Sequence, residues 1–179
     1  PYFKNTIFIF IGDHGLSRIA KHMHSGEYAL GVDAVHTPLI FYAPHLIKHK
    51  TIDYPVSEVD LISTIAGLMG KPYLNTTYGR DILDKKFDQS PHFSFFTTVE
   101  TNPYIELISK EYLFRMRSDG SEQSLFRFYY SKEEENLINK EINVASQMKN
   151  LCRGLYEATR YTRLNNETQK GLEGLKRAQ

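Results

Sequence analysis

Residues 5–15 read NTIFIFIGDHG. The run of β-branched and aromatic residues over 6–11 is apolar on both faces of a strand, as a central strand of a covered, mostly parallel sheet requires. It stops at the Gly-Asp-His-Gly turn of residues 12–15, where glycine lets the backbone turn sharply. In open α/β sheets, ligands bind just beyond the carboxyl ends of strands. The stretch therefore predicts a strand that delivers Asp13 and His14 to the edge of an α/β sheet.

Asp13 and His14 are candidate metal ligands, because a carboxylate beside an imidazole suits Zn²⁺ or Mn²⁺. Mg²⁺ and Ca²⁺ are the alternative ions. The alternative interpretation is a plain turn, in which Asp13 caps a helix and His14 is merely exposed. His36 directly precedes a second apolar run, and it is either a ligand or donor to a substrate oxyanion, or a histidine that caps a strand end. His24 is a further candidate for substrate binding.

The segments around this stretch predict an α/β portion followed by an antiparallel one. The connection over 16–35 has mixed composition and is expected to be a long irregular loop. The 56–69 segment has apolar residues at helical spacing and ends at Gly70, a common helix stop. Asp119-Gly120 is a strong hairpin signal. The expected strands are 6–11, 39–43, 93–99, 104–109, 112–117 and 125–130, and a last helix covers 143–163.

These elements define the expected architecture. Residues 1–90 are expected to form the C-terminal half of a metal-binding α/β core, with part of a mostly parallel sheet and helices. Residues 91–166 are expected to form a small antiparallel β subdomain with a C-terminal helix. The polar tail, 167–179, is expected to be disordered.

Composition excludes several classes of function. The chain has 22 basic and 21 acidic residues among 179, and this balance argues against bulk electrostatic binding of nucleic acid. The single cysteine, Cys152, excludes an internal disulfide and is expected to be a buried structural thiol. Ser17 and Ser25 lie near histidines, but neither sits in a GxSxG nucleophile elbow. No phosphate-binding glycine motif is present.

The order of these segments resembles the latter part of sulfatase domains in the alkaline-phosphatase/sulfatase superfamily. The similarity is to the branch with lipoteichoic acid synthases and other phosphoglycerol or phosphoethanolamine transferases. Two departures are Ser63, where the family helix usually has proline, and the lack of a clear anion-binding lysine after the DHG turn. The segments that carry the resemblance are NTIFIFIGDHG (5–15), HTPLIFYAP (36–44), VSEVDLISTIAGLMG (56–70), YGRDILD (78–84), SLFRFYYSKEEENLI (124–138) and YEATRYTRLNN (156–166).

The resemblance implies a divalent ion held by Asp13 and His14, with His24 and His36 acting on substrate oxygens. It places the nucleophile and the other metal ligands in motifs that precede this segment, so the nucleophile is not in this chain. The implied substrate is a phospholipid head group, or a glycan or sulfate ester. The implied parent protein is anchored by N-terminal helices, with its catalytic domain on the extracytoplasmic face of a bacterial inner membrane.

Two expectations concern the chain by itself. It is expected to be catalytically inactive, and to self-associate through the apolar face and unpaired edge of an incomplete sheet. The rival hypothesis is a noncatalytic binding or structural module in which the DHG turn is a vestigial metal site.

Overall fold

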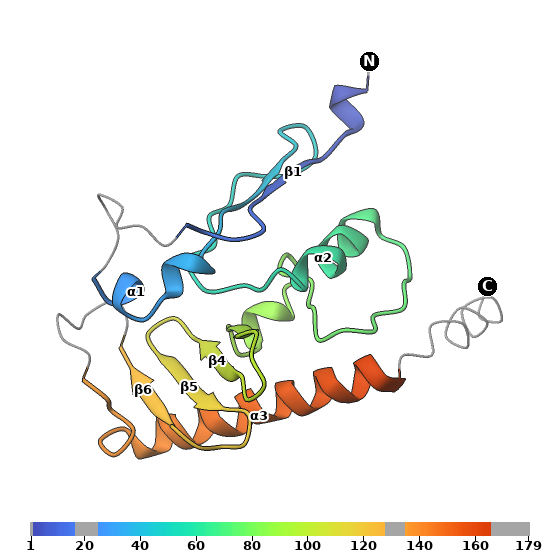
Figure 1. Ribbon diagram of the computed structural model, residues 1–179. Coiled ribbons are helices and arrows are strands. Elements are labelled where there is room, and N and C mark those ends of the chain that lie inside the picture. Colours follow the sequence, from blue (N-terminus) through green and yellow to red (C-terminus); the bar gives the residue numbers. More distant parts are fainter. Residues whose placement is uncertain (1, 17–24, 128–134, 166–179) are drawn as a thin grey trace. The chain divides into compact units, whose positions relative to one another are not determined.

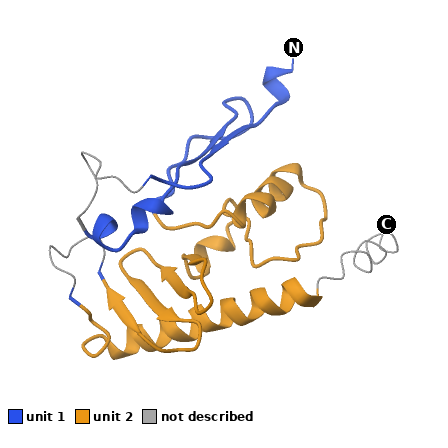
Figure 2. Ribbon diagram, viewed as in Figure 1, with its two compact units in different colours: residues 1–53, 127–135 blue, residues 54–126, 136–179 orange. Residues whose placement is uncertain are grey.

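The computed structural model describes residues 2–16, 25–127 and 135–165. The chain divides into two compact units (Figure 2). Unit 1 comprises residues 1–53 with 127–135, and unit 2 comprises 54–126 with 136–179. The architecture is α/β, with two antiparallel sheets and a C-terminal helix. Within the described ranges, no helix has both the length and the apolar character needed to cross a bilayer.

Unit 1 is built on a pair of strands, β1 (Phe8–Ile11) and β2 (Leu39–Tyr42) (Figure 1). Both strands lie where the apolar runs predict them. They pair with each other antiparallel, with Phe8 opposite Tyr42 and Ile11 opposite Leu39, and the described residues form no parallel sheet. A continuous apolar run identifies a strand but carries no information about the direction of its partner. No residue of β1 is buried, so the strand is not the covered central strand that the sequence predicts.

Short helical turns occupy part of the connection that we expected to be irregular. They are α1 (Ser25–Ala29) and η2 (Val32–Ala34), and a further turn, η1 (Phe3–Asn5), precedes β1. Gly31 separates α1 from η2 with a φ of 71°, a left-handed conformation that glycine adopts without strain.

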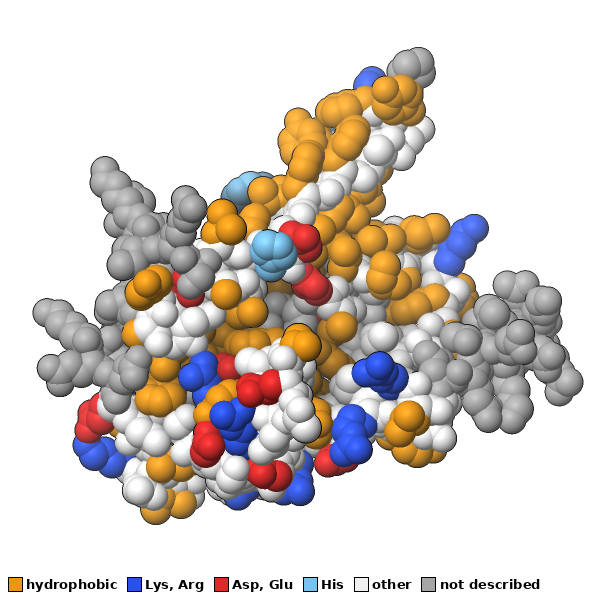
Figure 3. Space-filling view, viewed as in Figure 1, with side chains coloured by type: hydrophobic (Ala, Val, Ile, Leu, Met, Phe, Trp, Pro, Cys, Tyr) orange, Lys and Arg blue, Asp and Glu red, His pale blue; other side chains and the backbone are white. Residues whose placement is uncertain are grey.

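Apolar side chains gather along the strand pair of unit 1 (Figure 3). Phe10, Ile11, Ile40 and Tyr42 are all exposed. Contiguous exposed apolar surface of this kind is uncommon on a complete monomeric domain.

Unit 2 contains a four-stranded antiparallel sheet in the order β3-β4-β5-β6. Gly120, in the turn between β5 and β6, has a φ of 92°, which confirms the predicted Asp-Gly hairpin. The strands are β3 (Ser94–Thr97), β4 (Tyr104–Ile108), β5 (Leu113–Arg117) and β6 (Ser124–Phe126), and the helix α3 (Ile142–Asn165) packs against β4 and β5.

The core of unit 2 lies between one face of this sheet and α3. Cys152 is completely buried there, as predicted for a structural thiol, and burial raises the pKa of its thiol to about 12. The sheet contributes a row of facing residues, Phe95, Leu107, Phe114 and Leu125, and the helix contributes Ala145, Met148, Cys152 and Leu155 at helical spacing.

The helix α2 (Asp60–Met69) begins four residues later than predicted and ends at Gly70, as predicted. Its apolar residues Ile62 and Met69 are exposed, whereas its buried residues are Asp60, Ser63 and Thr64. The prediction that the apolar residues of α2 form its buried face is therefore wrong. The buried face is polar because its side chains make hydrogen bonds to the loop that follows the helix.

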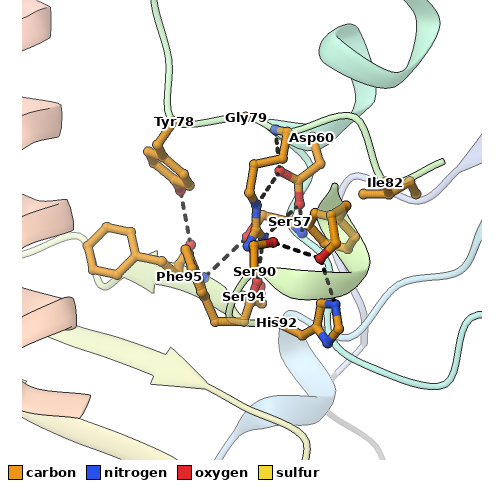
Figure 4. Close-up of polar contacts among 12 residues, drawn as sticks. Ser57, Asp60, Tyr78, Gly79, Ile82, Ser90, His92, Ser94 and Phe95 are labelled. Carbon is orange, nitrogen blue, oxygen red and sulfur yellow. Dashed lines mark hydrogen bonds and ion pairs between the residues drawn. The ribbon is translucent and has the colours of Figure 1, made fainter. Parts of the chain in front are cut away.

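Asp60 is the centre of that polar contact (Figure 4). Its carboxylate has no solvent exposure and accepts hydrogen bonds from the backbone N–H of Ser57, at 2.9 Å, and of Arg80, at 2.8 Å. The Arg80 guanidinium completes the pair, with Nε 3.3 Å from Oδ1 and Nη2 3.2 Å from Oδ2. Both carboxylate oxygens are thus bound by the same arginine, which is the strong, bidentate form of this interaction.

Arg80 is held on its other sides as well. Its guanidinium carbon lies 4.6 Å from the ring centre of Phe87 and 4.1 Å from that of Phe93. It also donates to the carbonyl oxygens of Pro91, at 2.7 Å, and Phe93, at 3.1 Å. One side chain therefore connects α2 to the segment that enters β3.

Ser57 precedes α2 by three residues and bonds to β3. Its hydroxyl accepts a hydrogen bond from the backbone N–H of Phe95 at 3.2 Å and donates to Ser94 at 3.3 Å. Like Arg80, Ser57 ties the start of α2 to β3.

We predict that Asp60→Ala lowers the free energy of unfolding of unit 2 by about 3–5 kcal/mol, because it leaves a largely buried guanidinium without its counter-charge. The matched control is Glu157→Ala, which removes the partner of Arg160 in an exposed ion pair on α3. The control should cost about 0–1 kcal/mol. Urea denaturation measures both, and equal losses would contradict the structural role of the Asp60–Arg80 pair.

Candidate metal and substrate site

Asp13 and His14 lie immediately after β1, in the turn where the sequence predicts them. Their side chains are 92% and 68% exposed. The backbone N–H of His14 donates to Asp13 Oδ1 at 3.0 Å, and Asp13 Oδ2 lies 3.9 Å from His14 Nε2. Among the residues that the structure describes, Asp13 caps no helix, so both side chains have donor atoms open to an ion from solvent.

The backbone fixes the orientation of the His14 ring. Nδ1 lies 2.9 Å from the carbonyl oxygen of Gly15, and a carbonyl can only accept, so Nδ1 carries the proton in this contact. In the neutral ring, the lone pair is then on Nε2, which is the form that a metal ion binds. The Gly15 carbonyl, and after it the charge of Asp13, raise the pKa of His14 above its usual value.

Gly15 is required by close packing within unit 1. Its N–H donates to the carbonyl oxygen of Ala34 at 2.9 Å, and a Cβ at this position would lie 2.0 Å from the backbone oxygen of Asp33. Any side chain would push the DHG turn away from η2. The second glycine of the motif is therefore explained by sterics.

His36 pairs with a carboxylate that the sequence analysis missed. Nδ1 of His36 lies 3.0 Å from Oε1 of Glu27, an α1 residue whose side chain is 8% exposed, whereas the His36 side chain is 64% exposed. Asp33 is a second buried carboxylate, and within the residues that the structure describes its oxygens have no hydrogen-bond partner. In the sequence, Glu27 and Asp33 differ from other acidic residues only in lying in a histidine-rich connection, which does not predict that they are buried.

The candidate residues that the structure describes do not form one complete site. Across the described ranges, no three side chains of the His, Cys, Asp and Glu types come together as a metal-binding group. Asp13 and His14 are adjacent, and His36 pairs instead with Glu27. His24 lies outside the described residues, so its predicted role stays a prediction.

A comparison with known families finds a match over the segment that contains this turn. Residues 1–71 match the family model described as Sulfatase. A protein named Sulfatase from Formosa agariphila is 39% identical over 70 residues, which is 39% of this chain and 14% of that protein. The matches support assigning this segment to the sulfatase/alkaline-phosphatase superfamily. The chain thus matches a small part of its relative. The segment that matches the family model contains β1, the DHG turn, β2 and α2.

We predict that Gly15→Ala destabilises unit 1 by about 1–3 kcal/mol, because the new methyl group cannot fit against the Asp33 carbonyl. Hydrogen exchange at the amides of β1 and β2 measures the effect locally. Gly154→Ala is the control, because no atom lies within 4 Å of its added Cβ and it sits in the helix α3. That change should be neutral or stabilise by up to about 1 kcal/mol. Unchanged exchange in Gly15→Ala would contradict the packing argument.

Proposed function

We propose that this chain is part of a metal-dependent enzyme that acts on phosphate or sulfate esters, in the manner of a sulfatase or phosphoglycerol transferase. The observation that carries the proposal is the open Asp13–His14 pair at the end of β1, inside the segment that matches the Sulfatase family. A Sulfatase family match favours hydrolysis of sulfate esters, and the histidine at position 36 favours the transferase side of the same superfamily.

The Asp13–His14 pair fits a divalent ion. Two donors bound to one Zn²⁺ at about 2.0–2.2 Å can lie at most about 4.4 Å apart. The observed 3.9 Å between Asp13 Oδ2 and His14 Nε2 is within that limit. The hydrogen bond at His14 Nδ1 also leaves Nε2 in the form that a metal requires. A mixed carboxylate and imidazole donor set suits Mn²⁺ or Zn²⁺.

In this proposal a bound ion would supply charge stabilisation at the ester oxygens and activation of the nucleophile. Asp13 and His14 would hold two coordination positions, and the Gly15 carbonyl would orient the His14 ring. His36, with His24, would contact the substrate oxygens or protonate the leaving group. The nucleophile and the remaining ligands would come from outside this chain, so we propose that the chain alone has no turnover.

The wider context is also a proposal. The substrate would be a phospholipid head group, or a glycan or sulfate ester, and the parent protein would be membrane-anchored with its catalytic domain outside the bacterial inner membrane. In that domain β1 would join a larger, mostly parallel sheet. The exposed apolar residues of β1 and β2 favour self-association of the chain when it is alone.

The alternative is a noncatalytic module with a vestigial metal site. The specific observation in its favour is that only two adjacent ligands meet at the DHG turn, with no third within the described part of the chain. Turnover by the protein in its longest native form, lost on removal of Asp13, would exclude this alternative.

We predict that the chain binds Mn²⁺ or Zn²⁺ weakly, and that the double variant Asp13→Ala, His14→Ala weakens binding at least about tenfold. Isothermal titration calorimetry measures the affinity, and His49→Ala, which removes an exposed histidine elsewhere in unit 1, is the control. Affinity should fall as the pH drops through the raised pKa of His14, because a proton then occupies Nε2. Equal affinity of the double variant and the parent sequence would place the ion elsewhere.

A further inference from the structure

The Glu27–His36 pair joins a buried carboxylate to an exposed imidazole. Glu27 Oε1 lies 3.0 Å from His36 Nδ1, with side-chain exposures of 8% and 64%. The carboxylate is therefore closed to solvent, while most of the ring is open to it. The pair therefore differs from a surface ion pair, in which both side chains are exposed to solvent and neither is fixed in one position.

The backbone holds both partners in place. The N–H of His36 donates to the carbonyl oxygen of Val32 at 2.8 Å, and the N–H of Leu30 donates to that of Gly26 at 3.0 Å, across α1. Gly31 turns the chain between the two segments with a positive φ. Asp33 lies nearby in the sequence, but it makes no hydrogen bond to the ring within the described residues. Glu27 is thus the carboxylate that the fold directs at His36.

The proton in this contact has one position. An ionised carboxylate only accepts, so His36 Nδ1 must carry the hydrogen that joins it to Glu27. A neutral ring then has its lone pair on Nε2. Free histidine in water prefers the opposite tautomer, with the proton on Nε2, so the pair overrides an intrinsic preference.

We propose that Glu27 is a positioning residue that sets the tautomer and the orientation of His36, so that Nε2 is the atom that reacts. This assignment rests on the proposed function. In the reaction, Nε2 accepts the proton of the attacking hydroxyl, which is the general-base counterpart of the leaving-group protonation proposed above. The O–H bond breaks and an N–H bond forms, while the electron pair stays on the oxygen. That oxygen forms the new bond to phosphorus or sulfur as the bond to the ester's leaving oxygen breaks, and the leaving oxygen departs with the electron pair of the broken bond. The imidazolium that results lies against the Glu27 carboxylate, which stabilises its charge.

The test is a long-range ¹H–¹⁵N NMR spectrum of the ¹⁵N-labelled chain, at a pH where the histidines are neutral. Protonated and unprotonated ring nitrogens appear in separate regions of this spectrum, and His36→Gln assigns the signals of His36. The structure supplies two internal references: His14 contacts a carbonyl oxygen through Nδ1, and His92 contacts the carbonyl oxygen of Phe87 through Nε2 at 3.1 Å.

We expect His36 to show the Nδ1–H tautomer, like His14 and unlike His92. In Glu27→Leu, which keeps the side-chain size but removes the acceptor, His36 should change to the Nε2–H tautomer while His92 keeps its own. The amide signals of β1 and β2 report whether the variant folds.

Two results would overturn the proposal: an Nε2–H tautomer of His36 in the unaltered chain, or a tautomer that does not change in a folded Glu27→Leu variant. If that variant does not fold, the spectrum of the unaltered chain decides alone. A failure here leaves metal binding at Asp13 and His14 untouched, and a failure of metal binding leaves the tautomer result standing. The two proposals are therefore separable.

Discussion

Asp60 carries its negative charge where no solvent reaches it, and unit 2 is arranged around the cost of that burial. Two backbone N–H groups and a bidentate guanidinium satisfy the carboxylate, and two aromatic rings and two carbonyl oxygens hold the guanidinium. The carboxylate and these partners come from the start of α2, from the loop after the helix and from the segment that enters β3. Because the buried charges require all of them, the three segments are fixed relative to one another. The core beneath α3 then follows from ordinary apolar packing.

In unit 1, hydrogen bonds to acceptor oxygens fix two histidine rings. The rings of His14 and His36 are both bound at Nδ1, one by the Gly15 carbonyl and the other by the Glu27 carboxylate. Both rings are largely exposed, so their Nε2 atoms remain available to a metal ion or a substrate. His92 in unit 2 is bound through Nε2 instead and stacks on Tyr54, as expected for a structural histidine. The ring nitrogen that makes the hydrogen bond thus distinguishes the two proposed functional histidines, His14 and His36, from the structural histidine His92.

The sequence predicts local features well. Apolar runs locate β1 and β2, Gly70 locates the end of α2, and Asp119-Gly120 locates the hairpin between β5 and β6. Each of these signals is contained in a few neighbouring residues. Local propensity and turn chemistry are therefore sufficient to predict the feature.

Features that depend on distant partners were missed. Arg80 is 20 residues from Asp60, and their pairing turns the polar side of α2 inward, against its apolar pattern. The antiparallel pairing of β1 with β2 and the contact of Glu27 with His36 likewise depend on how a connection folds back on itself. Within the site, Asp13 and His14 were found because they are adjacent at a strand end, and Glu27 was missed because nothing local distinguishes it.

The most direct test of the account is anomalous diffraction from Mn²⁺-soaked crystals of this protein in its longest native form. The account predicts an anomalous peak within bonding distance of both an Asp13 carboxylate oxygen and His14 Nε2. A peak elsewhere, with Asp13 and His14 both free of metal, would contradict it.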